Sequence, residues 1–188
     1  DENKRITYRS APGEKVIIKG SERITSWTSE AAGVWKVELP NSFFGQYNPY
    51  ALNVSGGWLN YGKWHHRGDV YLNGEAFRER QTPQEVAEAR HSWFCRADDK
   101  ATTIWANFGK ANPNKEMTEI NARESLFMPE ITGLKYITVD GLNFMHAAAN
   151  WAPPNLELQM GAIGPRMGKY WIIENCTITN ARCVGIIL

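Results

Sequence analysis

The sequence has few of the residues that would support several common classes of protein. Its 188 residues include three cysteines, Cys95, Cys176 and Cys183. Three cysteines are too few for a disulfide framework or a spaced zinc site, and an odd number cannot all form pairs. No apolar run reaches the length of a membrane span or a signal-peptide core. A formal net charge of +1 gives no general attraction to nucleic acid or anionic lipid. We therefore expect neither a nucleic-acid partner nor a membrane span.

Familiar catalytic and metal-binding signatures are missing as well. The sequence contains no phosphate loop, nucleophile elbow or zinc-protease motif. Adjacent His65 and His66 should point in different directions from a strand, while His91 and His146 show no ligand spacing. Carboxylates for acid–base chemistry are present, but no two form a motif: Asp69, Asp140, Glu157 and Glu174. The sequence thus predicts no metal site and no cofactor.

One segment occurs twice in the last third of the chain. KYITVDGLNF at 135–144 returns as KYWIIENCTI at 169–178, an offset of 34 residues. Apolar residues alternate in each copy, and the alternation slips by one residue at Gly141 and at Asn175. Such a slip predicts a corner between two short strands. Repeated strand pairs of this kind are typical of a parallel β-solenoid.

Helical repeats can have the same period, since tetratricopeptide units are also about 34 residues long. The repeated segment is rich in Ile, Val, Thr, Tyr and Phe and has no i, i+3, i+4 stripe, which favours strands. Chance similarity of two ordinary strands stays open as an alternative, although the shared polar corner favours a true repeat. VIIKG at 16–20 is similar to ITVDG at 137–141, so we interpret it as part of the first coil.

These patterns predict an all-β chain in three parts. Residues 1–27 form the first coil, 28–131 an inserted β-rich subdomain, and 132–188 further coils that continue past the C-terminus. The last residues, 184–188, read as an apolar strand without a cap. We therefore expect this to be the N-terminal part of a longer protein, with self-association through the open end near Leu188.

The insertion shows signals of a small, mostly antiparallel subdomain. VWKVEL at 34–39 alternates as a strand, and Asn73-Gly74 predicts a hairpin. TPQE at 82–85 supplies an N-cap, a first-turn proline and a capping-box glutamate, which predicts a short helix over 83–90. A second hairpin is predicted across 98–100, and a further strand over 119–127.

The densest group of chemically versatile residues is WLNYGKWHHRGD at 58–69. Aromatic rings stack on sugar faces, while Asn, His, Arg and Asp hydrogen-bond hydroxyl groups, so this mixture suits a carbohydrate pocket. The alternative is that Trp58, Tyr61 and Trp64 pack the insertion onto the solenoid, with Arg67 paired to Asp69. The loop NWAPP at 150–154 cannot continue a strand. The candidate binding residues are therefore Trp58, Tyr61, Trp64, His65, His66, Arg67 and Trp151.

Five runs together carry a resemblance to a known family: RITYRSAPGE at 5–14, GKWHHRGDVYLNG at 62–74, IWANF at 104–108, NWAPP at 150–154 and WIIEN at 171–175. They resemble the N-terminal part of glycoside hydrolase family 120, whose members are β-xylosidase-like enzymes. The resemblance covers essentially the whole chain. It implies a right-handed parallel β-helix with an inserted β-sandwich-like subdomain.

The resemblance also implies retaining hydrolysis of xylo-oligosaccharides by an Asp nucleophile and a Glu acid/base. In the family these carboxylates lie on later coils, in a Trp-Leu-Asp-Trp context and ahead of a Ser/Asn-His-Gly-Pro run, and neither run occurs here. We therefore expect the catalytic pair beyond Leu188. By the same resemblance the insertion contributes an aromatic residue to the sugar site, for which Trp64 is the candidate, with His65, His66 and Arg67 as pocket neighbours.

The expected function is the substrate-binding and scaffold portion of a secreted or periplasmic bacterial glycosidase. Its partner would be an oligosaccharide or polysaccharide, and we expect activity from the parent protein rather than from this chain alone. Two alternatives stay open. One is a non-catalytic glycan-binding β-helix module. The other is a polysaccharide lyase, which would need a cationic or Ca²⁺ site to neutralise a uronate, and the near-neutral charge gives this little support.

Overall fold

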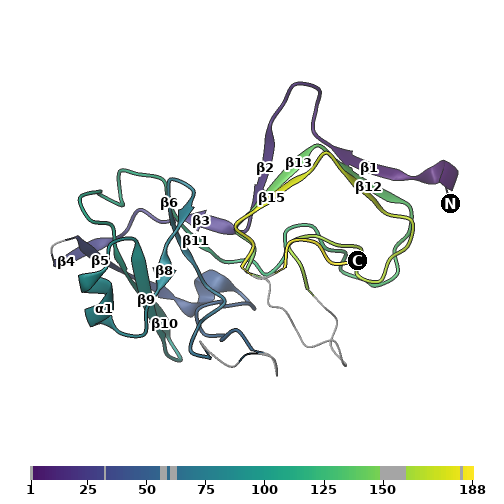
Figure 1. Ribbon diagram of the computed structural model, residues 1–188. Coiled ribbons are helices and arrows are strands. Elements are labelled where there is room, and N and C mark those ends of the chain that lie inside the picture. Colours follow the sequence, from purple (N-terminus) through teal and green to yellow (C-terminus); the bar gives the residue numbers. More distant parts are fainter. Residues whose placement is uncertain (1, 32, 56–58, 60–62, 149–159, 183) are drawn as a thin grey trace. The chain divides into compact units, whose positions relative to one another are not determined.

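The computed structural model describes residues 2–31, 33–55, 59, 63–148, 160–182 and 184–188. These residues form fifteen strands, one short α-helix and two 3-10 helices, so the predicted all-β class is confirmed. No helix in the described ranges is long and apolar enough to cross a membrane. The chain divides into two compact units, which are described separately (Figure 1). Unit 1 comprises Asp1–Gly20, Ser55–Leu59 and Arg123–Leu188, and unit 2 comprises Ser21–Val54 and Asn60–Ala122. The part boundaries expected from the sequence stay a prediction.

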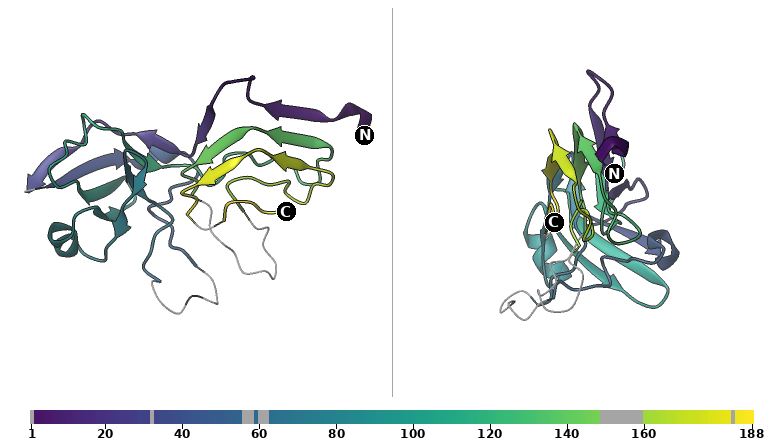
Figure 2. Two further views of the ribbon diagram at one scale, coloured as in Figure 1. Left: turned by 45° about the horizontal axis from the view of Figure 1, so that its top comes forward. Right: turned by 90° about the vertical axis from the view of Figure 1, so that its right-hand side faces the viewer.

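Unit 1 contains two parallel three-stranded sheets. One has the order β1 (Ile6–Arg9), β12 (Ile137–Asp140), β14 (Ile172–Glu174), and the other β15 (Thr177–Thr179), β13 (Leu142–Met145), β2 (Val16–Lys19). Val139 pairs with Ile173 and Phe144 with Ile178, the 34-residue offset of the sequence repeat. Figure 2 shows the strands of the two copies stacked one beside the other. The repeat is therefore structural.

A third row of unit 1 consists of isolated parallel bridges. Phe127, Ile163 and Ile186 form successive parallel bridges, Phe127 with Ile163 and Ile163 with Ile186. Ile163 is fully buried, as are Val139 and Phe144 from the two sheets. The apolar core of this unit therefore lies between three rows of backbone, and burial of aliphatic and aromatic side chains there is its main source of stability.

The corners repeat with the same offset as the strands. Gly141 and Asn175 have φ angles of 70° and 52°, which confirms the predicted corner. Left-handed backbone is accessible to Gly and, among other residues, most readily to Asn and Asp, which explains the residue types at this corner. Three further pairs of left-handed residues lie 34 positions apart, at Gly133 and Met167, at Tyr136 and Tyr170, and at His146 and Asn180. The Tyr136 and Tyr170 rings stack with centroids 4.8 Å apart.

One predicted alignment is wrong. Sequence similarity aligns VIIKG at 16–20 with ITVDG at 137–141, but β2 pairs with Leu142–Met145, the strand after the corner. The partner of Ile137–Asp140 is Ile6–Arg9. The first turn differs because its corner runs from Ser10 to Lys15, whereas later turns change direction at the single residue Gly141 or Asn175.

Unit 2 contains two sheets around a second core. The larger has the order β4 (Thr28–Ala31), β5 (Val34–Pro40), β10 (Ala101–Asn107), β9 (Ser92–Ala97), β8 (Arg78–Glu79). The smaller has the order β3 (Ser21–Arg23), β11 (Thr118–Asn121), β6 (Val70–Leu72), β7 (Glu75–Ala76). Pairing is antiparallel throughout except between β8 and β9. Fully buried Trp93, Tyr50, Ile104 and Ile120 lie in the core.

The hairpin and the short helix predicted within the insertion are both confirmed. Asn73 and Gly74 both have positive φ and connect β6 to β7, as the hairpin signal predicts. Helix α1 (Pro83–Glu88) begins after Thr82, whose side chain accepts a hydrogen bond from the Glu85 backbone N–H, and it ends two residues earlier than predicted. The strand predicted over 119–127 is shorter, ending at Asn121. The 3-10 helices are Glu2–Lys4 and Asn41–Phe44.

Candidate functional site

A buried carboxylate lies at the edge of the larger sheet of unit 2. Glu79 on β8 pairs in register with Trp93 on β9 and is 4% exposed. Side chains alternate along a strand, so Glu79 points to the same interior face as Trp93 and Cys95. A charged group buried in this way needs hydrogen-bonding partners, because removing it from water without them is very costly.

Those partners are two consecutive histidines. His65 Nδ1 lies 2.9 Å from Glu79 Oε2, and His66 Nδ1 lies 2.6 Å from Glu79 Oε1. The His66 backbone N–H lies 3.1 Å from both carboxylate oxygens. An ionised carboxylate only accepts hydrogen bonds, so each of these two ring contacts requires a proton on the Nδ1 of the histidine. The expectation that His65 and His66 point in different directions is therefore wrong.

Backbone bonds hold the same segment at its base. Asn53 and His66 form an antiparallel bridge, in which the Val54 N–H donates to His65 O at 2.7 Å and the Arg67 N–H to Leu52 O at 2.9 Å. The Asn53 side-chain amide also donates to Lys63 O at 2.9 Å. These bonds join the backbone at residues 52–54 to the backbone at 65–67. The contacts of Glu79 with His65 and His66 join the second of these segments to the edge of the sheet.

Beside the carboxylate is a pocket of about 290 Å³. Its lining combines two aromatic rings, an imidazole, two amides and a guanidinium: Trp64, Phe94, His66, Asn53, Gln81 and Arg80. The Trp64 ring packs on His65 with centroids 3.8 Å apart. Aromatic faces next to amide and cationic donors are the groups that bind a small polyhydroxylated ligand.

The structure gathers three of the sequence candidates and leaves others aside. Trp64, His65 and His66 lie together at this site, with Trp64 and His66 lining the pocket. Arg67 donates from Nε to Asn53 O at 3.3 Å and is not among the pocket-lining residues. The remaining candidates lie outside the described residues: Trp58, Tyr61 and Trp151.

Sequence reasoning missed the residue that organises the site. Glu79 shares a strand face with buried Phe77, so the alternation in Phe77-Arg78-Glu79 placed an acidic side chain on an apolar face. This acidic residue on an apolar face is the feature of the sequence that could have identified Glu79. Asp69, considered for acid–base chemistry, is instead buried, and its Oδ1 accepts from Trp93 Nε1 at 3.2 Å. Glu157, another such candidate, lies outside the described residues.

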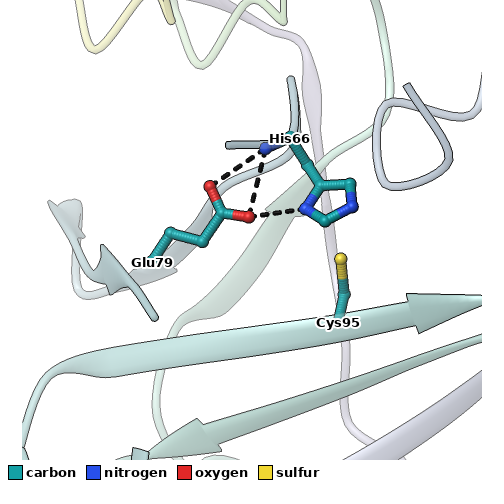
Figure 3. Close-up of side chains that lie close together, drawn as sticks. All are labelled: His66, Glu79 and Cys95. Atoms are coloured by element: carbon teal, nitrogen blue, oxygen red, sulfur yellow. Dashed lines mark hydrogen bonds and ion pairs between the residues drawn. The ribbon is translucent and has the colours of Figure 1, made fainter. Parts of the chain in front are cut away.

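Cys95 completes the surroundings of the carboxylate. Its Sγ lies 3.6 Å from Tyr50 O, and burial, together with the nearby Glu79 carboxylate, raises the pKa of the thiol well above its ordinary value. Figure 3 shows His66, Glu79 and Cys95 converging from three separate segments. Their donor atoms all lie within 4.8 Å of one another, and within the described ranges this is the one cluster of three potential metal ligands.

Comparisons with known proteins show the family of this chain. The glycoside hydrolase 120 insertion domain matches residues 24–92 and 83–120, which together span 97 of the 188 residues. The chain therefore belongs to glycoside hydrolase family 120, as the resemblance in the sequence indicated. No curated protein sequence matches it significantly.

Among solved structures, the chain is similar to XylC in its complex with xylose. The two are 43% identical with a TM-score of 0.91, and the match covers 99% of this chain. It covers 33% of the XylC chain, so the chain spans about a third of the length of that relative.

Proposed function

We propose that this chain is the substrate-binding and scaffold portion of a glycoside hydrolase that acts on xylo-oligosaccharides or related plant glycans. Family membership and likeness to a xylose-bound protein support the substrate class. The observation that carries the proposal for this chain is the pocket in unit 2, where Trp64 and His66 lie beside amide and guanidinium groups.

The proposal includes the full fold that the sequence suggests. Two parallel sheets whose strands stack with an offset of 34 residues, together with a third bridged row, support a right-handed parallel β-helix for unit 1. Strands β14 and β15 each lie at the edge of their sheet, which supports self-association through that side. A secreted or periplasmic location also belongs to the proposal.

The chemistry of the proposed enzyme is retaining hydrolysis by an Asp nucleophile and a Glu acid/base outside this chain. One of the acids considered from the sequence, Asp140, already has structural partners. Asp140 binds Arg9 at 3.2 Å and accepts from Asn175 Nδ2 at 2.8 Å, and Glu174 is its register neighbour. In the proposed enzyme, unit 2 binds sugar and unit 1 supports the coils that carry the catalytic pair.

Two measurements test the proposal. Hydrolysis of 4-nitrophenyl β-xyloside, run on this chain and on the full-length product of its parent gene, should appear only in the longer protein. Activity in neither would contradict a xylosidase, and activity in this chain alone would contradict a catalytic pair located elsewhere.

The second measurement addresses the pocket. In the full-length protein, Trp64→Ala should weaken binding of xylobiose by about tenfold, because loss of a stacking face costs roughly 1.5 kcal/mol. Tyr170→Ala is the matched control, since Tyr170 is an exposed aromatic residue of unit 1. Calorimetric titration of xylobiose reads both variants. Equal affinity in the Trp64→Ala variant and the wild type would remove Trp64 from the sugar site.

A further inference from the structure

The cluster around Glu79 offers more than hydrogen bonds. Three different donor types meet there: an imidazole from His66, a carboxylate from Glu79 on β8 and a thiol from Cys95 on β9 (Figure 3). The Glu79 side chain is 2% exposed and Cys95 is 3% exposed, so two of the three donors are buried. The cluster therefore differs from the exposed groups of acidic residues that are common without any ion.

We propose that His66 Nδ1, Glu79 Oε1 and Cys95 Sγ bind a divalent transition metal ion of the zinc class. Thiolate and imidazole are ligands that Zn²⁺ and Co²⁺ prefer, whereas Mg²⁺ and Ca²⁺ require oxygen donors. Thiolate, carboxylate and neutral imidazole together carry two negative charges, which a divalent ion neutralises. A neutral site is the form that a buried environment accepts most readily.

The geometry requires small movements. Tetrahedral coordination with bonds of about 2.0–2.1 Å places nitrogen and oxygen donors about 3.3 Å apart. His66 Nδ1 and Glu79 Oε1 are 2.6 Å apart, so the metal replaces the proton between them and opens this pair by about 0.7 Å. The sulfur, bound at about 2.3 Å, must come within about 3.6 Å of both. One imidazole nitrogen of His66 and one carboxylate oxygen of Glu79 now lie within 4.8 Å of the sulfur.

Outer contacts and access also fit a metal site. Glu79 Oε2 keeps its hydrogen bonds from His65 Nδ1 at 2.9 Å and the His66 N–H at 3.1 Å, and these hold the carboxylate in place while Oε1 binds the ion. His66 lines the 290 Å³ pocket, which gives the ion an entry path and lets water occupy a fourth coordination position. The Cys95 thiol gives up its proton, and with it the contact to Tyr50 O.

The test uses the whole chain, stripped of metal with EDTA, and does not rest on the proposed sugar-binding function. Addition of Co²⁺ should give one equivalent of binding with a sulfur-to-cobalt charge-transfer band in the near ultraviolet. In the Cys95→Ala variant that band should disappear and Zn²⁺ affinity should fall at least about 100-fold, as measured by calorimetry with Zn²⁺ alone. The matched control, Cys176→Ala/Cys183→Ala, leaves Cys95 as the single thiol and should keep both the band and the affinity.

Metal held only by surface histidines would bind equally well to the Cys95→Ala variant and would show no charge-transfer band, which overturns the proposal. Loss of the band in the control variant instead would overturn it too. X-ray absorption of the zinc-loaded wild type covers the case in which Cys95→Ala does not fold. We expect one sulfur at about 2.3 Å with nitrogen and oxygen neighbours at about 2.0 Å. A first shell without sulfur would refute the site.

Discussion

Replacing Glu79 with glutamine removes the buried charge while keeping the side-chain shape. Removing one partner of a buried, hydrogen-bonded ionic group costs about 3–5 kcal/mol. Glutamine retains one acceptor oxygen, which can still receive the His66 backbone N–H, but it presents an NH₂ group where His65 Nδ1 or His66 Nδ1 now donates. We therefore expect Glu79→Gln to lower the free energy of unfolding of unit 2 by about 2–3 kcal/mol.

Urea unfolding followed by tryptophan fluorescence measures this effect, with EDTA present so that bound metal does not contribute. Glu75→Gln on β7 is the matched control, because Glu75 is exposed and its replacement should change stability by less than about 0.5 kcal/mol. A loss below about 1 kcal/mol in Glu79→Gln, or a loss equal to that of the control, would refute the idea that this carboxylate holds the site together.

A double-mutant cycle separates the contact from the general effect of removing a charge. His65→Gln alone removes one ring donor to the carboxylate. If His65 and Glu79 stabilise each other directly, the two substitutions together should cost at least about 1 kcal/mol less than the sum of the single losses. Additive losses would mean that the two side chains are close but energetically independent.

Two further predictions concern corners and turns. Gly141→Ala should lower stability by more than about 1–2 kcal/mol, since φ is 70° and the new Cβ would lie 2.7 Å from Ser10 Oγ. Gly13→Ala, at φ 81° with open space around it, should show the backbone cost alone, so equal thermal shifts in the two variants would contradict the packing argument. Asp98 accepts from the Ala101 and Lys100 backbone N–H groups, and these bonds hold its pKa below the ordinary 3.8. Because the pKa of Asp98 in the folded state is below the ordinary 3.8, its ionised carboxylate stabilises the fold at pH values above 3.8. Asp98→Ala should therefore be less stable than wild type at pH 7, and this difference in stability should shrink as the pH falls below 3.8. A gap that does not vary with pH would assign the loss to something other than the charge.

Local patterns predicted the 34-residue repeat because each copy carries its own information. Alternation of apolar residues and a corner at Gly141 or Asn175 depend on neighbours in sequence, and both recur at the same offset in space. Pairing of the first turn could not be predicted in the same way. The apolar pattern of 16–20 fits either limb of a coil, and only the length of the corner after Ser10 decides that β2 joins the second sheet.

The residue that orients the candidate site could not be predicted, for a related reason. The sequence identified Trp64, His65 and His66 from their composition, and these three residues do lie together. What orients them is Glu79 on β8, thirteen and fourteen residues further along the chain, and no local rule connects this short strand to the loop before it. A weak signal was present, because Glu79 follows Phe77 on the buried face. Recognising it requires asking why an acid lies where an apolar residue is expected.

The position of Glu79 explains why one residue serves both the fold and the site. Strand β8 is the outer strand of its sheet, and an exposed edge would be open to pairing with another chain. An inward-pointing charge on such a strand disfavours continuation of the sheet, and here that charge also attracts the segment of His65 and His66. The aromatic and polar residues that line the pocket are therefore held by the same interaction that protects the edge. A substitution at Glu79 should consequently affect stability and ligand binding together, whereas a substitution at Trp64 should affect binding alone.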